Sequence, residues 1–115
     1  MESGILDIEK IKQIMSDDTE AIISFFELFK EQTKIEIADL EKFIAENNWN
    51  EVSKIAHKLK SSYGSIGSTS AYNILAQMEE VCKNAPDYNQ VIELNKKYSF
   101  VQNKILEEMD KFISN

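Results

Sequence analysis

The chain has 115 residues, of which 43% are hydrophobic and 29% charged, and its formal net charge is −7. This length fits one domain, which we place over residues 1–115, and the charge argues against binding to nucleic acid or to anionic membranes, because both usually require a basic surface. No apolar run approaches the ~20 residues of a membrane span, and the N-terminus has no signal-peptide pattern. We therefore expect a cytoplasmic protein without membrane contact.

Only three glycines and one proline are present, which favours a few long helices. A short helix is predicted over residues 6–15, and the run Ser16-Asp17-Asp18 ends it and offers an N-cap for the next helix. The second helix is predicted over residues 19–46. Its apolar residues recur at helical spacing and are Ile22, Phe25, Phe26, Phe29, Ile37, Leu40, Phe43 and Ile44.

Asn47 and Asn48 end this long helix, and a third helix is predicted over residues 49–65. Gly67 then provides a stop and Ser68 a cap for a fourth helix over residues 69–83. Pro86 lies in the following turn, and the last helix is predicted over residues 88–114. We predict an all-α fold, an antiparallel four-helix bundle with a short extra N-terminal helix that covers one end.

The single histidine, His57, lies in the middle of the third predicted helix. At roughly 100° per residue, the apolar residues of this helix form one stripe, and His57 lies about 150° from the centre of that stripe. The stripe consists of Val52, Ile55, Ala56, Leu59, Tyr63 and Ile66. The imidazole should therefore face solvent or a partner, beside Ser53, Lys60, Ser61 and Gly64.

A lone histidine on a helix is usually an ordinary surface residue, but its neighbours suggest a function here. Gly64 lies two turns away on the same face, although a glycine inside a helix costs about 1 kcal/mol relative to alanine. Lys60 lies one turn away, where it could meet an anion attached to the imidazole. A neutral imidazole nitrogen is a nucleophile near pH 7, so phosphoryl transfer through His57 is the chemistry that fits.

The segment from His57 to Gly67 resembles the signature of histidine-containing phosphotransfer (HPt) domains. In that family the pattern is His, any residue, Leu, Lys, Gly, two small residues, two variable ones, an aliphatic residue and Gly. His57, Leu59, Lys60, Ile66 and Gly67 match it. Two positions depart, because Ser61 stands in place of glycine and Tyr63 in place of a small residue. Ser61 should preserve access to the histidine, and Tyr63 falls on the buried stripe.

The resemblance implies that His57 is phosphorylated, that Lys60 stabilises the phosphoryl charge, and that Ser61, Gly64 and Gly67 support the site. The implied partners are the receiver domains of response regulators and a hybrid sensor histidine kinase. The resemblance implies no cofactor of the chain's own, since Mg²⁺ would be bound by the receiver. We expect a monomer that contacts its receiver through a small apolar surface, for which Ile8, Ile11 and Ile23 are the candidates.

Other features of the sequence are weaker. Cys82 should be a buried hydrophobic residue, and one histidine and one cysteine far apart make no metal site. Glu79 could approach the exposed face of the histidine helix and orient a side chain there, but we expect it to be solvated. Glu79 and Glu80 are adjacent on a helix and should point in different directions, which argues against a catalytic pair.

Two other functions remain open. A fragment of a catalytic histidine kinase would usually show an acidic residue after the histidine and a proline one turn later, whereas Lys58 follows His57 and the only proline is Pro86. A structural adaptor, in which the helical bundle binds a receiver or kinase without phosphotransfer, is the second alternative.

Overall fold

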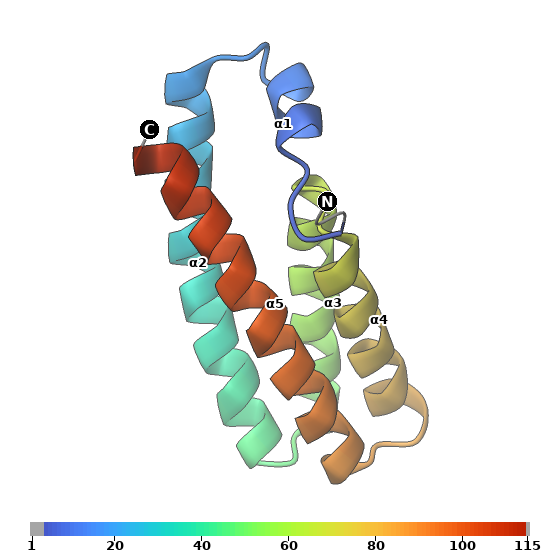
Figure 1. Cartoon of the computed structure of the whole chain (residues 1–115). Coiled ribbons are helices and arrows are strands. Elements are labelled where there is room, and N and C mark those ends of the chain that lie inside the picture. Colours follow the sequence, from blue (N-terminus) through green and yellow to red (C-terminus); the bar gives the residue numbers. More distant parts are fainter. Residues whose placement is uncertain (1–3, 115) are drawn as a thin grey trace.

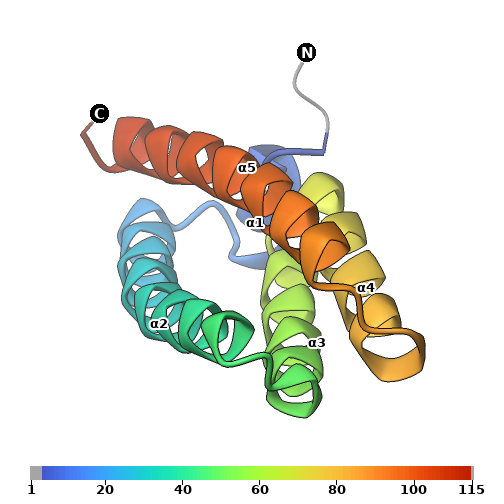
Figure 2. The same cartoon turned by 90° about the horizontal axis from the view of Figure 1, so that it is seen from below.

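The computed structural model describes residues 4–114, which form five helices and no strand (Figure 1). The helices are α1 (Ile8–Ile14), α2 (Thr19–Ala45), α3 (Trp49–Ser65), α4 (Thr69–Asn84) and α5 (Tyr88–Ser114). The last four run antiparallel to their neighbours in the chain and follow one another around a bundle (Figure 2). The predicted fold class is confirmed. Within the described residues, none of the helices combines the length and the apolar character that crossing a membrane requires.

The ends of the helices are defined by local capping. The side chains of Asp18, Asn48 and Ser68 accept hydrogen bonds from backbone N–H groups in the first turns of α2, α3 and α4. The C-termini of α2 and α3 are closed by Asn47 (φ 55°) and Gly67 (φ 72°), both in the left-handed region. Because these signals are local, the predicted limits of α3 and α5 agree with the structure, and those of α2 and α4 differ by one residue.

Gly67 is required by its surroundings as well as by its backbone. Its N–H donates to Gly64 O at 3.2 Å, and Ser68 N–H donates to Tyr63 O at 3.0 Å, which closes α3 in a Schellman motif. A Cβ at position 67 would lie only 2.6 Å from Asp7 Cβ. Two features therefore exclude a side chain at position 67: its φ lies in the left-handed region, and Asp7 of the N-terminal segment packs against it.

That N-terminal segment attaches α1 to the turn between α3 and α4. Asp7 N–H donates to Ile66 O at 3.1 Å, and Ser70 N–H donates to Gly4 O at 2.8 Å. Helices α3 and α4 are shorter than α2 and α5, and α1 lies beyond their upper end, as predicted for the extra helix (Figure 1). Ile11, one of the three predicted docking residues, is only 2% exposed because it packs into the core here. That assignment was wrong.

The core is apolar along the bundle and contains one buried polar cluster. Tyr63 O–H donates to Gln102 Oε1, and Tyr98 O–H donates to Tyr63 at 2.6 Å. Burial raises the pKa of both tyrosines, so both hydroxyls stay neutral. Tyr63 is fully buried, as the helical wheel predicted. Cys82 is also buried, and burial raises the pKa of its thiol to about 11.

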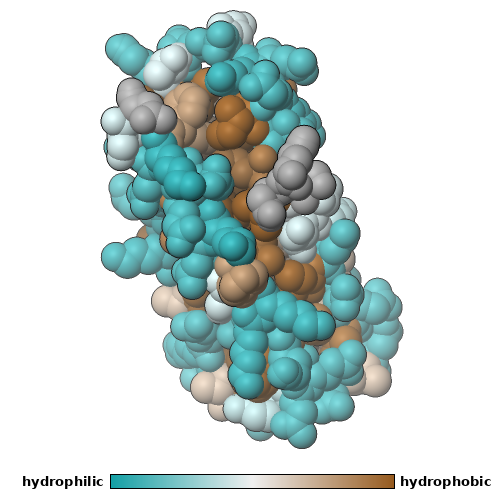
Figure 3. All heavy atoms as spheres, viewed as in Figure 1, coloured by the Kyte–Doolittle hydropathy of each residue, from teal (hydrophilic) through white to brown (hydrophobic). Residues whose placement is uncertain are grey.

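The outer surface that α5 presents is mainly hydrophilic. Figure 3 shows this face, on which hydrophobic side chains gather in a seam beside the upper half of α5 and are otherwise scattered. The exposed large apolar residues of the described chain are Ile14, Leu28, Ile35, Tyr72, Tyr88 and Phe100. Of these, Tyr72 lies against Lys60 and Gly64 on the face that carries His57, as described below.

Candidate functional site

His57 projects from the middle of α3, and its side chain is 63% exposed. The predicted stripe on the opposite side is turned inward, since Val52, Ala56, Leu59 and Tyr63 are buried. The prediction of an exposed imidazole is therefore confirmed. It follows that a macromolecular partner can reach the ring without any rearrangement of the bundle.

Ser53 differs from its predicted place on the exposed face. The residue is 5% exposed and buried. The reason is that α4 packs against α3 on the flank shared by Ser53 and Lys60, where Lys60 bonds to Glu79 of α4. A helical wheel considers one helix without its neighbours, so it predicted that this flank of α3 is exposed to solvent.

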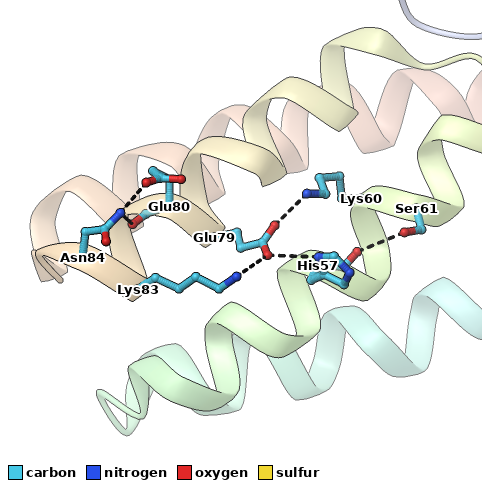
Figure 4. A network of polar contacts seen from close by, with 7 residues as sticks. All are labelled: His57, Lys60, Ser61, Glu79, Glu80, Lys83 and Asn84. Carbon is cyan, nitrogen blue, oxygen red and sulfur yellow. Dashed lines mark hydrogen bonds and ion pairs between the residues drawn. The ribbon is translucent and has the colours of Figure 1, made fainter.

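Glu79 of α4 links His57 to two lysines (Figure 4). Its Oε2 lies 3.0 Å from His57 Nδ1 and 3.0 Å from Lys83 Nζ, and its Oε1 accepts a hydrogen bond from Lys60 Nζ at 2.8 Å. The glutamate is 7% exposed, so our expectation that it is solvated was wrong, and the alternative that it orients a side chain of the histidine face is the one the geometry supports. We call these four residues the His57 cluster.

The carboxyl of Glu79 remains ionised in this position. Burial by itself raises its pKa, but the hydrogen bonds from Lys60, Lys83 and His57 outweigh burial and lower the pKa to about 2. The hydrogen bond to Glu79 in turn raises the pKa of Lys60, against the opposing effect of burial. At neutral pH the site therefore contains one carboxylate and two ammonium groups around the imidazole.

An ionised carboxylate can only accept hydrogen bonds, so the contact with Glu79 places a proton on His57 Nδ1. In a neutral imidazole the other nitrogen, Nε2, then carries the free lone pair. This nitrogen lies on the side of the ring away from Glu79. The pairing thus fixes the tautomer of the histidine and leaves its nucleophilic atom directed away from α4.

The remaining predicted site residues lie close to the histidine on α3. Ser61 is exposed, and its hydroxyl donates to His57 O at 3.4 Å. A Cβ at Gly64 would lie 3.5 Å from Cδ2 of Tyr72, which is an ordinary van der Waals contact. Position 64 therefore accepts an alanine, and only larger side chains would clash with the tyrosine ring. Gly67 acts at a distance from the site, because it ends the helix that carries His57.

Glu79 was a candidate from the sequence but was expected to be solvated, and Lys83 and Tyr72 were not predicted, although a signal for the α4 side of the site exists. The buried stripe of α4 includes Leu75, Met78 and Cys82, and Glu79 lies at the edge of that stripe. A carboxylate at the border of an apolar face, one turn before a lysine, is a candidate for a buried ion pair. Glu80 by contrast is exposed and bonds to Asn84, which agrees with the prediction that the two glutamates point in different directions.

The proposed docking residues are only partly available. Ile8 and Ile23 are half-buried, and Ile11 is buried as described above. Among residues 4–114 no group of three or more His, Cys, Asp or Glu side chains is arranged to hold a metal ion. The expectation about cofactors is not tested by this observation and stays a prediction.

Comparison with models of protein families matches residues 24–112 to the Hpt domain. This match covers most of the chain and includes α3, α4 and the whole His57 cluster. The chain belongs to the Hpt domain family. Hpt domains function in phosphotransfer within two-component systems, where they interact with receiver domains and kinases. No curated protein and no solved structure matched the chain.

Proposed function

We propose that this Hpt domain is a phosphocarrier that relays a phosphoryl group between receiver-domain aspartates through His57. The observation that carries the proposal is the exposed imidazole whose Nδ1 is held by an ionised Glu79. An exposed acceptor suits a relay, because the other half of the active site belongs to the partner. The family match supports the reaction class.

The transfer step follows from the tautomer of His57. The Nε2 lone pair attacks the phosphorus of a phosphoaspartate, an N–P bond forms, and the bond between phosphorus and the aspartate oxygen breaks, releasing the carboxylate. The product is a phosphoimidazolium whose Nδ1–H stays hydrogen-bonded to Glu79. Because this ring becomes positively charged while it is attached to the phosphoryl group, the carboxylate beside it stabilises the product more than the reactant.

Lys60 and Lys83 favour an anion at the site. Together with Glu79 they leave one excess positive charge next to the imidazole of His57. Lys60 is the better placed of the two lysines to interact with the phosphoryl group, since it lies on the same helix as His57 and its side chain is 18% exposed. We propose that it moves part of its interaction from Glu79 to the phosphoryl oxygens during transfer.

The proposal is tested by label transfer. The domain is mixed with a receiver phosphorylated with ³²P in the presence of Mg²⁺, which the receiver would bind. Wild-type protein should acquire an acid-labile label, and His57→Gln should acquire none. Lys60→Ala should slow the transfer more than Lys60→Arg, since arginine keeps the charge but changes the shape of the donor. Equal labelling of wild type and His57→Gln would refute the proposal.

The same assay separates the alternatives. Labelling by ATP alone would indicate a kinase and would contradict a phosphocarrier without autonomous activity. Receiver binding that survives His57→Ala, with no label on the wild type, would indicate an adaptor. We further propose that the protein acts as a cytoplasmic monomer, which size-exclusion chromatography and fractionation of cells would check.

A further inference from the structure

Tyr72 stands at the edge of the His57 cluster and takes no part in the chemistry described above. It belongs to a strip of α4 formed by Tyr72, Ala76, Glu79 and Lys83, which recur at the spacing of one helical face. Glu79 from this strip contacts His57 and Lys60 on α3. Tyr72 therefore continues the phosphoacceptor surface along the seam between the two helices.

The contacts of Tyr72 place its ring against the signature residues of α3. Lys60 Nζ lies 5.7 Å from the centroid of the ring, within reach of a cation–π interaction. Gly64 lies beside the Cδ2 and Cε2 atoms of the ring, and a Cβ there would be 3.5 Å from Cδ2. Despite these contacts the residue is 40% exposed. An aromatic side chain is thus held in a defined position with much of its surface facing solvent.

We propose that Tyr72 is an anchor at which the receiver domain docks beside His57. The inference rests on the proposed function, because it assumes that a receiver must cover His57 Nε2. Seven residues separate His57 from Gly64, about 10 Å along the helix. An interface at the small end of the usual range, about 600 Å² per partner, has a radius of about 14 Å, so a receiver centred on His57 covers Tyr72.

The chemistry of Tyr72 suits a role in docking. Tyrosine is enriched among the residues that dominate binding at protein interfaces, because it buries a large rigid surface and offers one hydroxyl. The receiver surface that borders its aspartate would supply an apolar patch for the ring. The docking surface then extends along the seam between α3 and α4, whereas the sequence had pointed to the first two helices.

The test separates docking from chemistry by using two phosphoryl donors. Phosphoramidate is a small donor that needs no docking surface, and its P–N bond breaks with release of ammonia as His57 is phosphorylated. Tyr72→Ala should lower kcat/KM for transfer from a phosphorylated receiver about tenfold or more, mainly through KM. Its rate of labelling by phosphoramidate should stay within twofold of wild type. Tyr72→Phe should lose less than Tyr72→Ala.

Tyr88→Ala is the matched control, because Tyr88 is 48% exposed and its ring lies against Trp49, whereas the ring of Tyr72 lies against Lys60 and Gly64. It should leave both rates unchanged. Wild-type transfer rates for Tyr72→Ala would overturn the proposal. So would an equal loss with both donors, which would show that Tyr72 only positions Lys60. Circular dichroism establishes that each variant is folded before the rates are compared.

Direct binding distinguishes a failure of this proposal from a failure of the proposed function. The affinity of purified receiver domains from the source organism is measured against His57→Gln and against the double variant His57→Gln/Tyr72→Ala, in which no phosphoryl group can move. A Kd at least tenfold weaker for the double variant would support docking at Tyr72 even if transfer were absent. Equal affinities, or no binding of any receiver by His57→Gln, would refute docking at Tyr72.

Discussion

Helix α3 carries two polar clusters, and the difference between them shows how the fold separates stability from function. Tyr63, Tyr98 and Gln102 form a neutral cluster inside the core, in which the phenolic hydrogens are used within the protein. The His57 cluster lies six residues earlier at the surface and is charged, and one of its nitrogens, Nε2, is left open. A buried polar group must be satisfied internally, whereas a site that reacts with a partner must keep one group free.

Of the substitutions considered, removal of the Glu79 carboxylate should have the largest effect, and it should act on phosphoryl transfer through the His57 cluster. Glu79→Gln replaces an obligatory acceptor by a group that can also donate, so the tautomer of His57 is no longer fixed. We expect phosphoryl transfer to fall about 10- to 100-fold, by analogy with the loss of groups that orient histidine ligands. The matched control is Glu80→Gln on the exposed side of α4, which should transfer at the wild-type rate.

Acid should destabilise the protein through the same residue. The pKa of Glu79 is lowered in the folded state from an ordinary value of 4.5 to about 2. The stabilisation is therefore fully present above about pH 4.5 and is lost as the pH falls towards 2. Urea unfolding across this range should show a steeper loss of stability for wild type than for Glu79→Gln. Parallel curves for the two proteins would contradict the role assigned to the carboxylate.

Disturbing the buried cluster should affect stability and spare the reaction. Tyr98→Phe removes the hydroxyl that donates to Tyr63, which should lower the free energy of unfolding by about 1–2 kcal/mol. Transfer to His57 in the folded variant should be unchanged. Tyr88→Phe, at an exposed position, serves as the control. A large loss of transfer without a loss of stability would show that the two clusters are coupled.

Gly64, inside α3, and Gly67, just after its end, should respond differently to alanine. Gly67→Ala places a Cβ in the left-handed region and against Asp7, so we expect a loss of about 1–3 kcal/mol. Gly64→Ala meets Tyr72 at an ordinary distance and removes a helix-interior glycine, so it should gain up to about 1 kcal/mol. Thermal unfolding of both variants tests this, and equal effects would contradict the environments described for them.

Much of the fold could be predicted because its signals are local. The caps Asp18, Asn48 and Ser68 and the stop at Gly67 act within a few residues of the helix end that they define. The exposure of His57 and the burial of Tyr63 followed from the period of one helix.

The α4 half of the site could not be predicted in the same way. The burial of Ser53 and the contact of Glu79 with His57 depend on how close α4 approaches α3. The burial of Ile11 depends on how α1 lies on the end of the bundle. The distances between helices are set by packing, and they cannot be predicted from the apolar periodicity of one helix.

We propose that Glu79 holds Nδ1 of His57 so that Nε2 receives the phosphoryl group. Nuclear magnetic resonance of ¹⁵N-histidine-labelled protein, before and after transfer from a phosphorylated receiver, tests it most directly. We predict that Nδ1 is protonated in the free protein and that phosphorus couples to Nε2 after transfer. A phosphoryl group on Nδ1, or none on His57, would contradict the account.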